Sequence, residues 1–187
     1  APLYIVHLST AKGLEIVRAA RRSGRRVWAE TCPQYLLLTD ECYSGDFENA
    51  LKYVMAPVPR KKADVEALWE GLVDGSISTV ATDHCSFSWQ EKKARAGGNV
   101  FNCPGGIPGV ETRLSLLYSE GVIKRGMSLS RWVDLVSTMP SRLFGLAGKG
   151  EIKPGLDADL VIFDPYKEKK LNADNLHQAV DYTPFEN

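Results

Sequence analysis

The 187-residue sequence lacks an excess of charge of either sign, because 23 lysines and arginines balance 23 aspartates and glutamates. Without surplus positive charge, general nucleic-acid binding and attachment to an acidic membrane surface have no electrostatic basis. Long apolar runs are also absent, since none approaches the roughly 20 residues that a membrane-spanning helix needs. The first residues do not resemble a signal peptide. We therefore expect neither a nucleic-acid partner nor a membrane partner.

Cysteine is scarce and widely scattered. The four cysteines form no C-x-x-C pair, which argues against a zinc ribbon and against a disulfide-rich secreted scaffold. The composition, with 44% hydrophobic and 25% charged residues, is typical of a folded globular protein. We therefore expect a protein of the reducing cytoplasm.

Short apolar runs alternate with helical patterns along the chain. The helical spacing is clearest at Val65, Leu68, Trp69 and Leu72, which follow the i, i+3, i+4, i+7 rule. Unbroken apolar strands between amphipathic helices are typical of a parallel sheet covered by helices. The predicted strands span residues 3–7, 27–31, 77–81 and 159–163. A long loop is predicted between His84 and Gly109, where glycine and proline are frequent.

The chain is too short for a complete barrel. A closed eight-fold α/β barrel takes about 250 residues, whereas this sequence offers three or four strand–helix units. Two alternatives remain, a small open sheet or part of a barrel. The first predicted strand starts at residue 3 and no clear final element follows, which favours the second. The expected fold class is therefore α/β, a partial (β/α)8 TIM barrel.

Three chemically useful side chains follow predicted strands. His7 ends the first, and Asp83 and His84 follow the third. In parallel α/β folds, reacting groups gather at the carboxyl ends of the strands. Imidazole and carboxylate are ligands that suit a hydrolytic divalent metal, although a catalytic zinc site takes three protein ligands. The sequence thus indicates half of a metal site, with a surface histidine and a loop-anchoring aspartate as the structural alternative.

Two other signals are weaker. Cys85 adjoins His84, but adjacent residues of an extended segment point to opposite sides, so only His7 on another strand would serve as its base. A small buried hydrophobe is the alternative for Cys85. The glycine-rich residues 104–109 lack the Lys and Ser/Thr of a P-loop. Their glycines would instead let a ligand approach the backbone closely.

Five motifs in a fixed order give the sequence a family resemblance. They are VHLST at 6–10, ETCPQYL at 30–36, ATDHC at 81–85, PGGIPGVE at 104–111 and GLDADLVI at 155–162. In this order they resemble the hydantoinase/dihydropyrimidinase family of metal-dependent amidohydrolases. The second motif is the most discriminating, because dihydroorotases tend to carry two histidines there and allantoinases one, whereas this sequence has Gln34 and Tyr35.

The resemblance implies a distorted (β/α)8 barrel with a small β-sandwich built from both chain ends. Residues 1–150 would supply the sixth to eighth barrel strands with their helices. Residues 151–187 would begin the carboxyl-terminal sandwich segment, with 159–163 as its return strand.

The resemblance also implies a binuclear metal site, with two divalent ions, usually zinc, and a bridging hydroxide that attacks the carbonyl carbon of a cyclic amide. His7 would bind the second ion; Asp83 would bind the first and carry the proton to the leaving ring nitrogen. The remaining ligands, including a carbamylated lysine, are expected upstream of Ala1. Main-chain groups at Ala56 and Gly105 would bind the amide edge of the substrate, although relatives often have Ser and Asn there.

The implied activity is the opening of hydantoins or dihydropyrimidines to N-carbamoyl amino acids, by a homotetramer when the protein is intact. The isolated chain is expected to be inactive. Three alternatives remain: another cyclic amidohydrolase such as an allantoinase or dihydroorotase, a non-catalytic dihydropyrimidinase-like scaffold, and an unrelated small α/β binding domain. The presence of both His7 and Asp83 disfavours the scaffold, which has no need of a costly buried imidazole and carboxylate.

Overall fold

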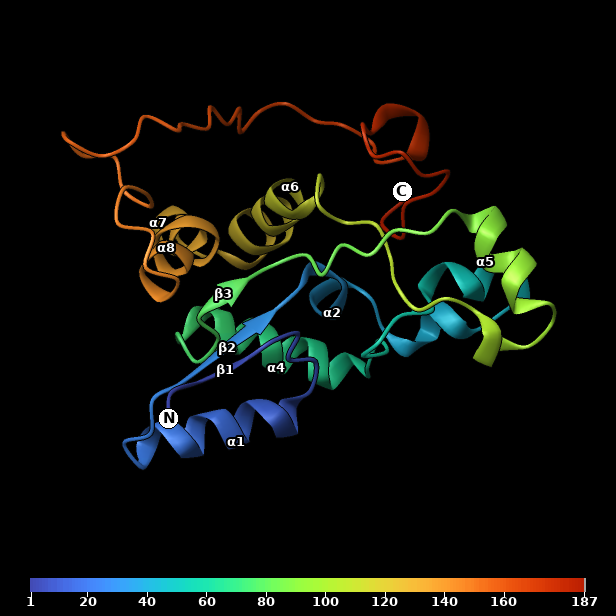
Figure 1. Cartoon of the computed structure of the whole chain (residues 1–187), viewed down its shortest axis with the longest axis horizontal. Coiled ribbons are helices and arrows are strands. Elements are labelled where there is room, and N and C mark those ends of the chain that lie inside the picture. Colours follow the sequence, from blue (N-terminus) through green and yellow to red (C-terminus); the bar gives the residue numbers. More distant parts are fainter. Residues whose placement is uncertain (187) are drawn as a thin grey trace.

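The computed structural model of the protein describes residues 1–186, and its centre is a sheet of three parallel strands (Figure 1). The strands are β1 (Leu3–Ile5), β2 (Val27–Thr31) and β3 (Thr79–Val80), in the order β1-β2-β3. Their register pairs Leu3 with Val27 and Thr31 with Val80. The predicted parallel α/β arrangement is confirmed, although β1 and β3 are shorter than the apolar runs that predicted them.

Two helices of the same length form the crossovers between the strands. Helix α1 (Ala11–Arg22) connects β1 to β2, and α4 (Lys62–Val73) lies between β2 and β3. Thr10 begins α1, because its hydroxyl accepts a hydrogen bond from Gly13 N at 3.1 Å. Gly24 follows the helix with a φ of +77°, which favours glycine. With the strand order β1-β2-β3, right-handed crossovers place both helices on the same side of the sheet, and α1 and α4 contact each other.

The remaining helical elements surround this unit. The short α-helices are α2 (Pro33–Leu37), α3 (Phe47–Ala50), α5 (Trp89–Ala96), α6 (Arg113–Leu117), α7 (Leu129–Val133) and α8 (Met139–Leu143). The 3-10 turns are η1 (Asp40–Tyr43), η2 (Leu51–Tyr53), η3 (Val100–Asn102) and η6 (Ala173–Asn175). The π-helical turn η4 (Tyr118–Ile123) extends α6, and η5 (Asp134–Thr138) joins α7 to α8.

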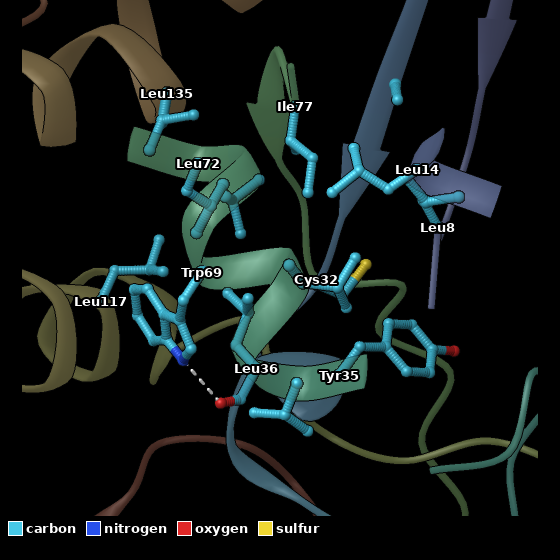
Figure 2. Packing of buried hydrophobic residues seen from close by; sticks show 14 of the residues in the cluster. Leu8, Leu14, Cys32, Tyr35, Leu36, Trp69, Leu72, Ile77, Leu117 and Leu135 are labelled. Carbon is cyan, nitrogen blue, oxygen red and sulfur yellow. Dashed lines mark hydrogen bonds between the residues drawn. The ribbon is translucent and has the colours of Figure 1, made fainter. Parts of the chain in front are cut away.

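The hydrophobic core lies between the sheet and α4 (Figure 2). Leu68 and Leu72 of α4 are fully buried, as the helical spacing predicts, and Leu14 of α1 is equally buried. The indole Nε1 of Trp69 donates a 2.8 Å hydrogen bond to the Leu36 carbonyl, so this large ring is buried without an unpaired donor. The packing fixes α2, and with it the junction that follows β2, against α4.

Helix α5 is a difference from the sequence prediction, which placed only a loop between His84 and Gly109. Its sequence gives no apolar stripe, and the two residues it buries are Lys92 and Ala96. Capping stabilises it instead. The Ser88 hydroxyl accepts from Glu91 N at 3.0 Å, and the Asp181 carboxylate accepts from Trp89 N at 2.6 Å.

The predicted strand over residues 159–163 does not form. These residues have no regular structure in this chain, and Ile162 is 99% exposed. A strand needs a neighbouring strand to satisfy its backbone groups, and none within residues 1–186 pairs with this segment. Phe163 packs on the rest of the protein, with its ring 4.8 Å from that of Tyr118 and 4.9 Å from that of Trp132, and Asp159 forms an ion pair with Lys149.

Every helix within residues 1–186 is too short or too polar to cross a lipid bilayer.

Candidate active site

His7 and Asp83 share an unusual backbone conformation. Their φ angles are +40° and +50°, and every other described residue with a φ of this sign is a glycine. For a residue with a Cβ this conformation costs about 1–3 kcal/mol, and such strain concentrates at functional sites. The two predicted metal ligands are thus the two strained non-glycine positions of the described chain.

Both residues lie at the carboxyl edge of the sheet, His7 two positions beyond Ile5 and Asp83 three positions beyond Val80. The strands that carry them are separated by β2, so by strand spacing alone they are about 10 Å apart. Two ligands that bind different ions of a binuclear pair are separated by about 8 Å, from two metal–ligand bonds and an ion spacing of about 3.5–4 Å. The spacing of the strands is therefore of the same order as the separation that such a ligand pair needs.

Three side chains of the ETCPQYL segment hold the backbone beside predicted site residues. The buried Thr31 hydroxyl donates to the Leu8 carbonyl at 2.8 Å, next to His7. The buried Gln34 amide donates to the Thr82 carbonyl at 3.2 Å, next to Asp83.

Tyr35, the third of these side chains, donates through its hydroxyl to the Pro57 carbonyl at 3.2 Å, next to Ala56. Burial raises the pKa of Tyr35, so the hydroxyl remains a neutral donor. The junction of β2 and α2 therefore connects three parts of the candidate site.

His84 has a different role from its neighbour Asp83. Its Nδ1 accepts hydrogen bonds from Gly109 N at 3.1 Å and Val110 N at 3.2 Å. Because Nδ1 is engaged as an acceptor, it is not available to a metal ion or to take the proton of Cys85. His84 instead anchors the glycine-rich segment to the end of β3, helped by a hydrogen bond from Cys85 N to the Ile107 carbonyl at 3.1 Å.

The two segments predicted to bind the substrate meet at one hydrogen bond. Gly106 N donates to the Val54 carbonyl at 3.0 Å, which places residues 54–56 beside residues 105–106. Ala56 and Gly105 are both exposed, so their main-chain groups are accessible to a ligand.

The adjacent glycines of the second segment differ in their surroundings. A Cβ at Gly105 would meet nothing within 4 Å, so a larger side chain would fit there. At Gly106, where φ is +153°, a Cβ would lie 2.4 Å from the Cys85 carbonyl oxygen. This close approach of two segments is what requires glycine at position 106.

The donor chemistry of the site fits divalent metal ions, because it offers one imidazole and one carboxylate at one edge of the sheet. Within residues 1–186, no group of three or more His, Cys, Asp and Glu side chains is placed to hold an ion. His7 and Asp83 alone are fewer than the three protein ligands that a catalytic zinc site takes.

Sequence patterns did not identify Thr31, Gln34 or Tyr35 as residues that support the candidate site. Polar side chains that are almost fully buried mark them in the structure, with exposed fractions of 2% or less. The only signal in the sequence was the motif at 30–36, whose individual roles depend on contacts with distant segments.

Comparisons with known proteins identify the family of the chain. Residues 5–185 match the model of the amidohydrolase family. A D-phenylhydantoinase of Escherichia coli O1:K1 is 47% identical over all 187 residues, which cover 40% of its length. Solved structures of a D-hydantoinase from Bacillus sp. AR9 and a dihydropyrimidinase from Brevibacillus agri NCHU1002 match the whole chain with TM-scores of 0.97 and 0.96, at 42% and 40% identity.

The chain spans about two fifths of the length of these relatives, 41% in both solved structures. Within that span, the likeness includes every element that carries a predicted site residue. The chain therefore belongs to the amidohydrolase family, in its hydantoinase and dihydropyrimidinase group.

Proposed function

We propose that the intact protein is a metal-dependent hydrolase that opens cyclic amides, converting hydantoins or 5,6-dihydropyrimidines to N-carbamoyl amino acids. The observation that carries this proposal is the positive φ angle of both His7 and Asp83, which lie at the carboxyl edge of the sheet. The similarity of the chain to a D-phenylhydantoinase supports it. Backbone strain at two positions of one edge is retained where the geometry of the side chains matters more than local stability.

In this proposal, His7 and Asp83 are ligands of two divalent ions, for which zinc is the first candidate. When bound, such ions polarise the amide carbonyl and make a water molecule more acidic. Asp83 also accepts the proton of the attacking water and delivers it to the ring nitrogen as the carbon–nitrogen bond breaks. The exposed Asp83 carboxylate is accessible for this transfer.

Main-chain groups at Ala56 and Gly105 would orient the amide edge of the ring. Neither position contributes a polar side chain, so recognition there depends on how firmly the backbone is held. The Tyr35 contact with Pro57 and the Gly106 contact with Val54 supply that support.

The finer architecture follows the same resemblance. We propose that residues 1–150 form the sixth to eighth strands of a (β/α)8 barrel with their helices, and that 151–187 begin the sandwich segment. The exposed residues 160–162 would then become a strand once they find their partner in the intact protein. A cytoplasmic location is consistent with the four free cysteines, and assembly as a homotetramer remains a prediction from the family resemblance.

The test is a substrate panel with the intact protein: hydantoin, 5-phenylhydantoin, dihydrouracil, allantoin and dihydroorotate. We expect hydrolysis of the first three, and a decrease in kcat of about 10²- to 10⁴-fold in Asp83→Asn. The exposed variant Asp174→Asn is the matched control and should retain full activity.

Preference for allantoin or dihydroorotate would assign the protein to another cyclic amidohydrolase. No hydrolysis of any substrate, with no bound metal, would contradict the proposal and favour the non-catalytic scaffold.

A further inference from the structure

Lys92 on α5 is a buried cation without a counter-ion. Its exposed fraction is 0%, and no carboxylate of residues 1–186 forms an ion pair with it. Removing an ammonium group from water costs several kcal/mol unless its environment compensates. A lysine at this position therefore needs a physical reason that its helix alone does not supply.

The ammonium group makes two hydrogen bonds to main-chain carbonyls. Lys92 Nζ donates to the Leu51 carbonyl at 3.1 Å and to the Val54 carbonyl at 2.8 Å. It also lies 5.9 Å from the centre of the buried Tyr182 ring, within reach of a cation–π interaction. Burial lowers the pKa of Lys92 to about 8, so at neutral pH the ammonium form still predominates and can donate both hydrogen bonds.

The Val54 carbonyl is shared with the second segment of the candidate site, because it also accepts the hydrogen bond from Gly106 N. Ala56 follows Val54 by two residues, and Gly105 immediately precedes Gly106. One carbonyl oxygen thus joins α5, the backbone before Ala56 and the backbone after Gly105.

We propose that Lys92 is a positioning residue of the enzyme, which fixes the main chain at Ala56 and Gly105 so that both segments bind the amide edge of the substrate. This inference rests on the proposed function. It assigns part of the substrate recognition to a side chain that does not touch the substrate itself. The hydrogen bonds of Lys92 restrict the freedom of both segments before the ring binds, which lowers the entropic cost of binding.

Lys92→Met is the informative variant. Methionine matches the length and apolar character of the stem, and replacement of a buried charge by an apolar side chain of similar size is often tolerated. Both carbonyls keep a main-chain donor, Val54 N for Leu51 at 3.2 Å and Gly106 N for Val54. The variant should therefore fold.

Lys93→Met is the matched control on the same helix. Lys93 lies beside Lys92 in sequence, but its Nζ is 3.7 Å from Glu48 and 4.2 Å from the centre of the Trp89 ring. Within residues 1–186, no hydrogen bond of its ammonium group reaches either segment of the candidate site, unlike those of Lys92.

The experiment combines steady-state kinetics on hydantoin and dihydrouracil with amide hydrogen exchange of the intact enzyme. We expect Lys92→Met to raise KM about tenfold and to lower kcat by less than about threefold. Exchange should become faster at Gly106 and in the peptide that contains Ala56. Lys93→Met should match the wild type in both measurements.

Faster exchange with an unchanged KM would show that Lys92 is only structural and would contradict the proposal, as would an unchanged exchange pattern. Equal changes in both lysine variants would contradict it too. A wild-type enzyme that hydrolyses neither substrate would instead contradict the proposed function, and the exchange comparison would still decide whether Lys92 orders these segments.

Discussion

His7 and Asp83 adopt positive φ angles in a chain whose other described positions of this kind are all glycines. The contacts that keep them there come from other side chains, because Thr31 and Gln34 hold the carbonyls of the neighbouring residues Leu8 and Thr82. At the residue scale, the buried side chains of Thr31 and Gln34 therefore maintain the strained backbone of half-buried His7 and exposed Asp83.

The adjacent glycines of the substrate segment allow a matched comparison. Gly106→Ala should lower the free energy of unfolding by about 1–3 kcal/mol and raise KM, because its Cβ would approach the Cys85 carbonyl oxygen to 2.4 Å. Gly105→Ala should change the free energy of unfolding by no more than about 0.5 kcal/mol and KM by no more than about twofold, since its Cβ meets nothing within 4 Å. Chemical denaturation and KM measurements on the intact enzyme test this, and equal effects of the two substitutions would contradict the geometry.

Burial of Lys92 makes stability depend on pH. Its pKa is about 8 in the folded protein and 10.5 without burial, so between these values the unfolded state binds more protons. The difference in unfolding free energy, wild type minus Lys92→Met, should therefore rise with pH, by about 2 kcal/mol from pH 7 to 9.5. Denaturation of both proteins at the two pH values measures it, and a difference that falls or stays constant would contradict the burial of the cation.

At the scale of elements, the junction of β2 and α2 connects the parts of the site, whereas side chains at the opposite edge serve stability. Arg131 represents the second group, since its guanidinium donates to the carbonyls of Leu72 and Ile77 at 2.7 Å each. This division matches the general rule for parallel α/β folds, in which the carboxyl ends of the strands carry function.

Substitution at the two edges should separate these roles. Gln34→Glu keeps the shape of the side chain but replaces its donor by an acceptor facing the Thr82 carbonyl, so kcat/KM should fall about tenfold or more. Arg131→Met should lower the unfolding free energy by about 1–3 kcal/mol with kcat/KM within about twofold of the wild type. A greater loss of kcat/KM in Arg131→Met than in Gln34→Glu would contradict this division of roles between the two edges.

Sequence patterns predicted some elements well and missed others for physical reasons. The periodicity of Val65, Leu68 and Trp69 predicted α4, because one face of that helix is buried in the core. Helix α5 was not predicted because it has no apolar stripe; capping and a buried lysine stabilise it instead. The strand expected at 159–163 has an apolar pattern but no partner within residues 1–186.

The same distinction applies to the candidate site. Its residue types and their placement after strands are visible in the sequence, which is enough to select His7 and Asp83 as candidates. The contacts of Tyr35 with Pro57 and of Lys92 with Val54 join segments 22 and 38 positions apart, and no local pattern encodes them.

At the scale of the whole molecule, the chain holds two predicted ligands of a site that needs more. Within residues 1–186 no set of three donors can hold an ion. The isolated 187-residue chain should therefore hydrolyse neither hydantoin nor dihydrouracil, even with added zinc. An assay of the purified chain tests this, with the intact enzyme as the positive control. Measurable metal-dependent hydrolysis by the chain alone would contradict the prediction that the site needs further ligands.

We expect His7 and Asp83 to lie at one binuclear metal site of the intact protein. Anomalous diffraction at the zinc absorption edge, from crystals of the intact protein grown with zinc, tests it most directly. We predict two peaks about 3.5–4 Å apart, one about 2.0–2.1 Å from an imidazole nitrogen of His7 and one about 2.0–2.2 Å from a carboxylate oxygen of Asp83. Bound zinc that contacts neither side chain would contradict it.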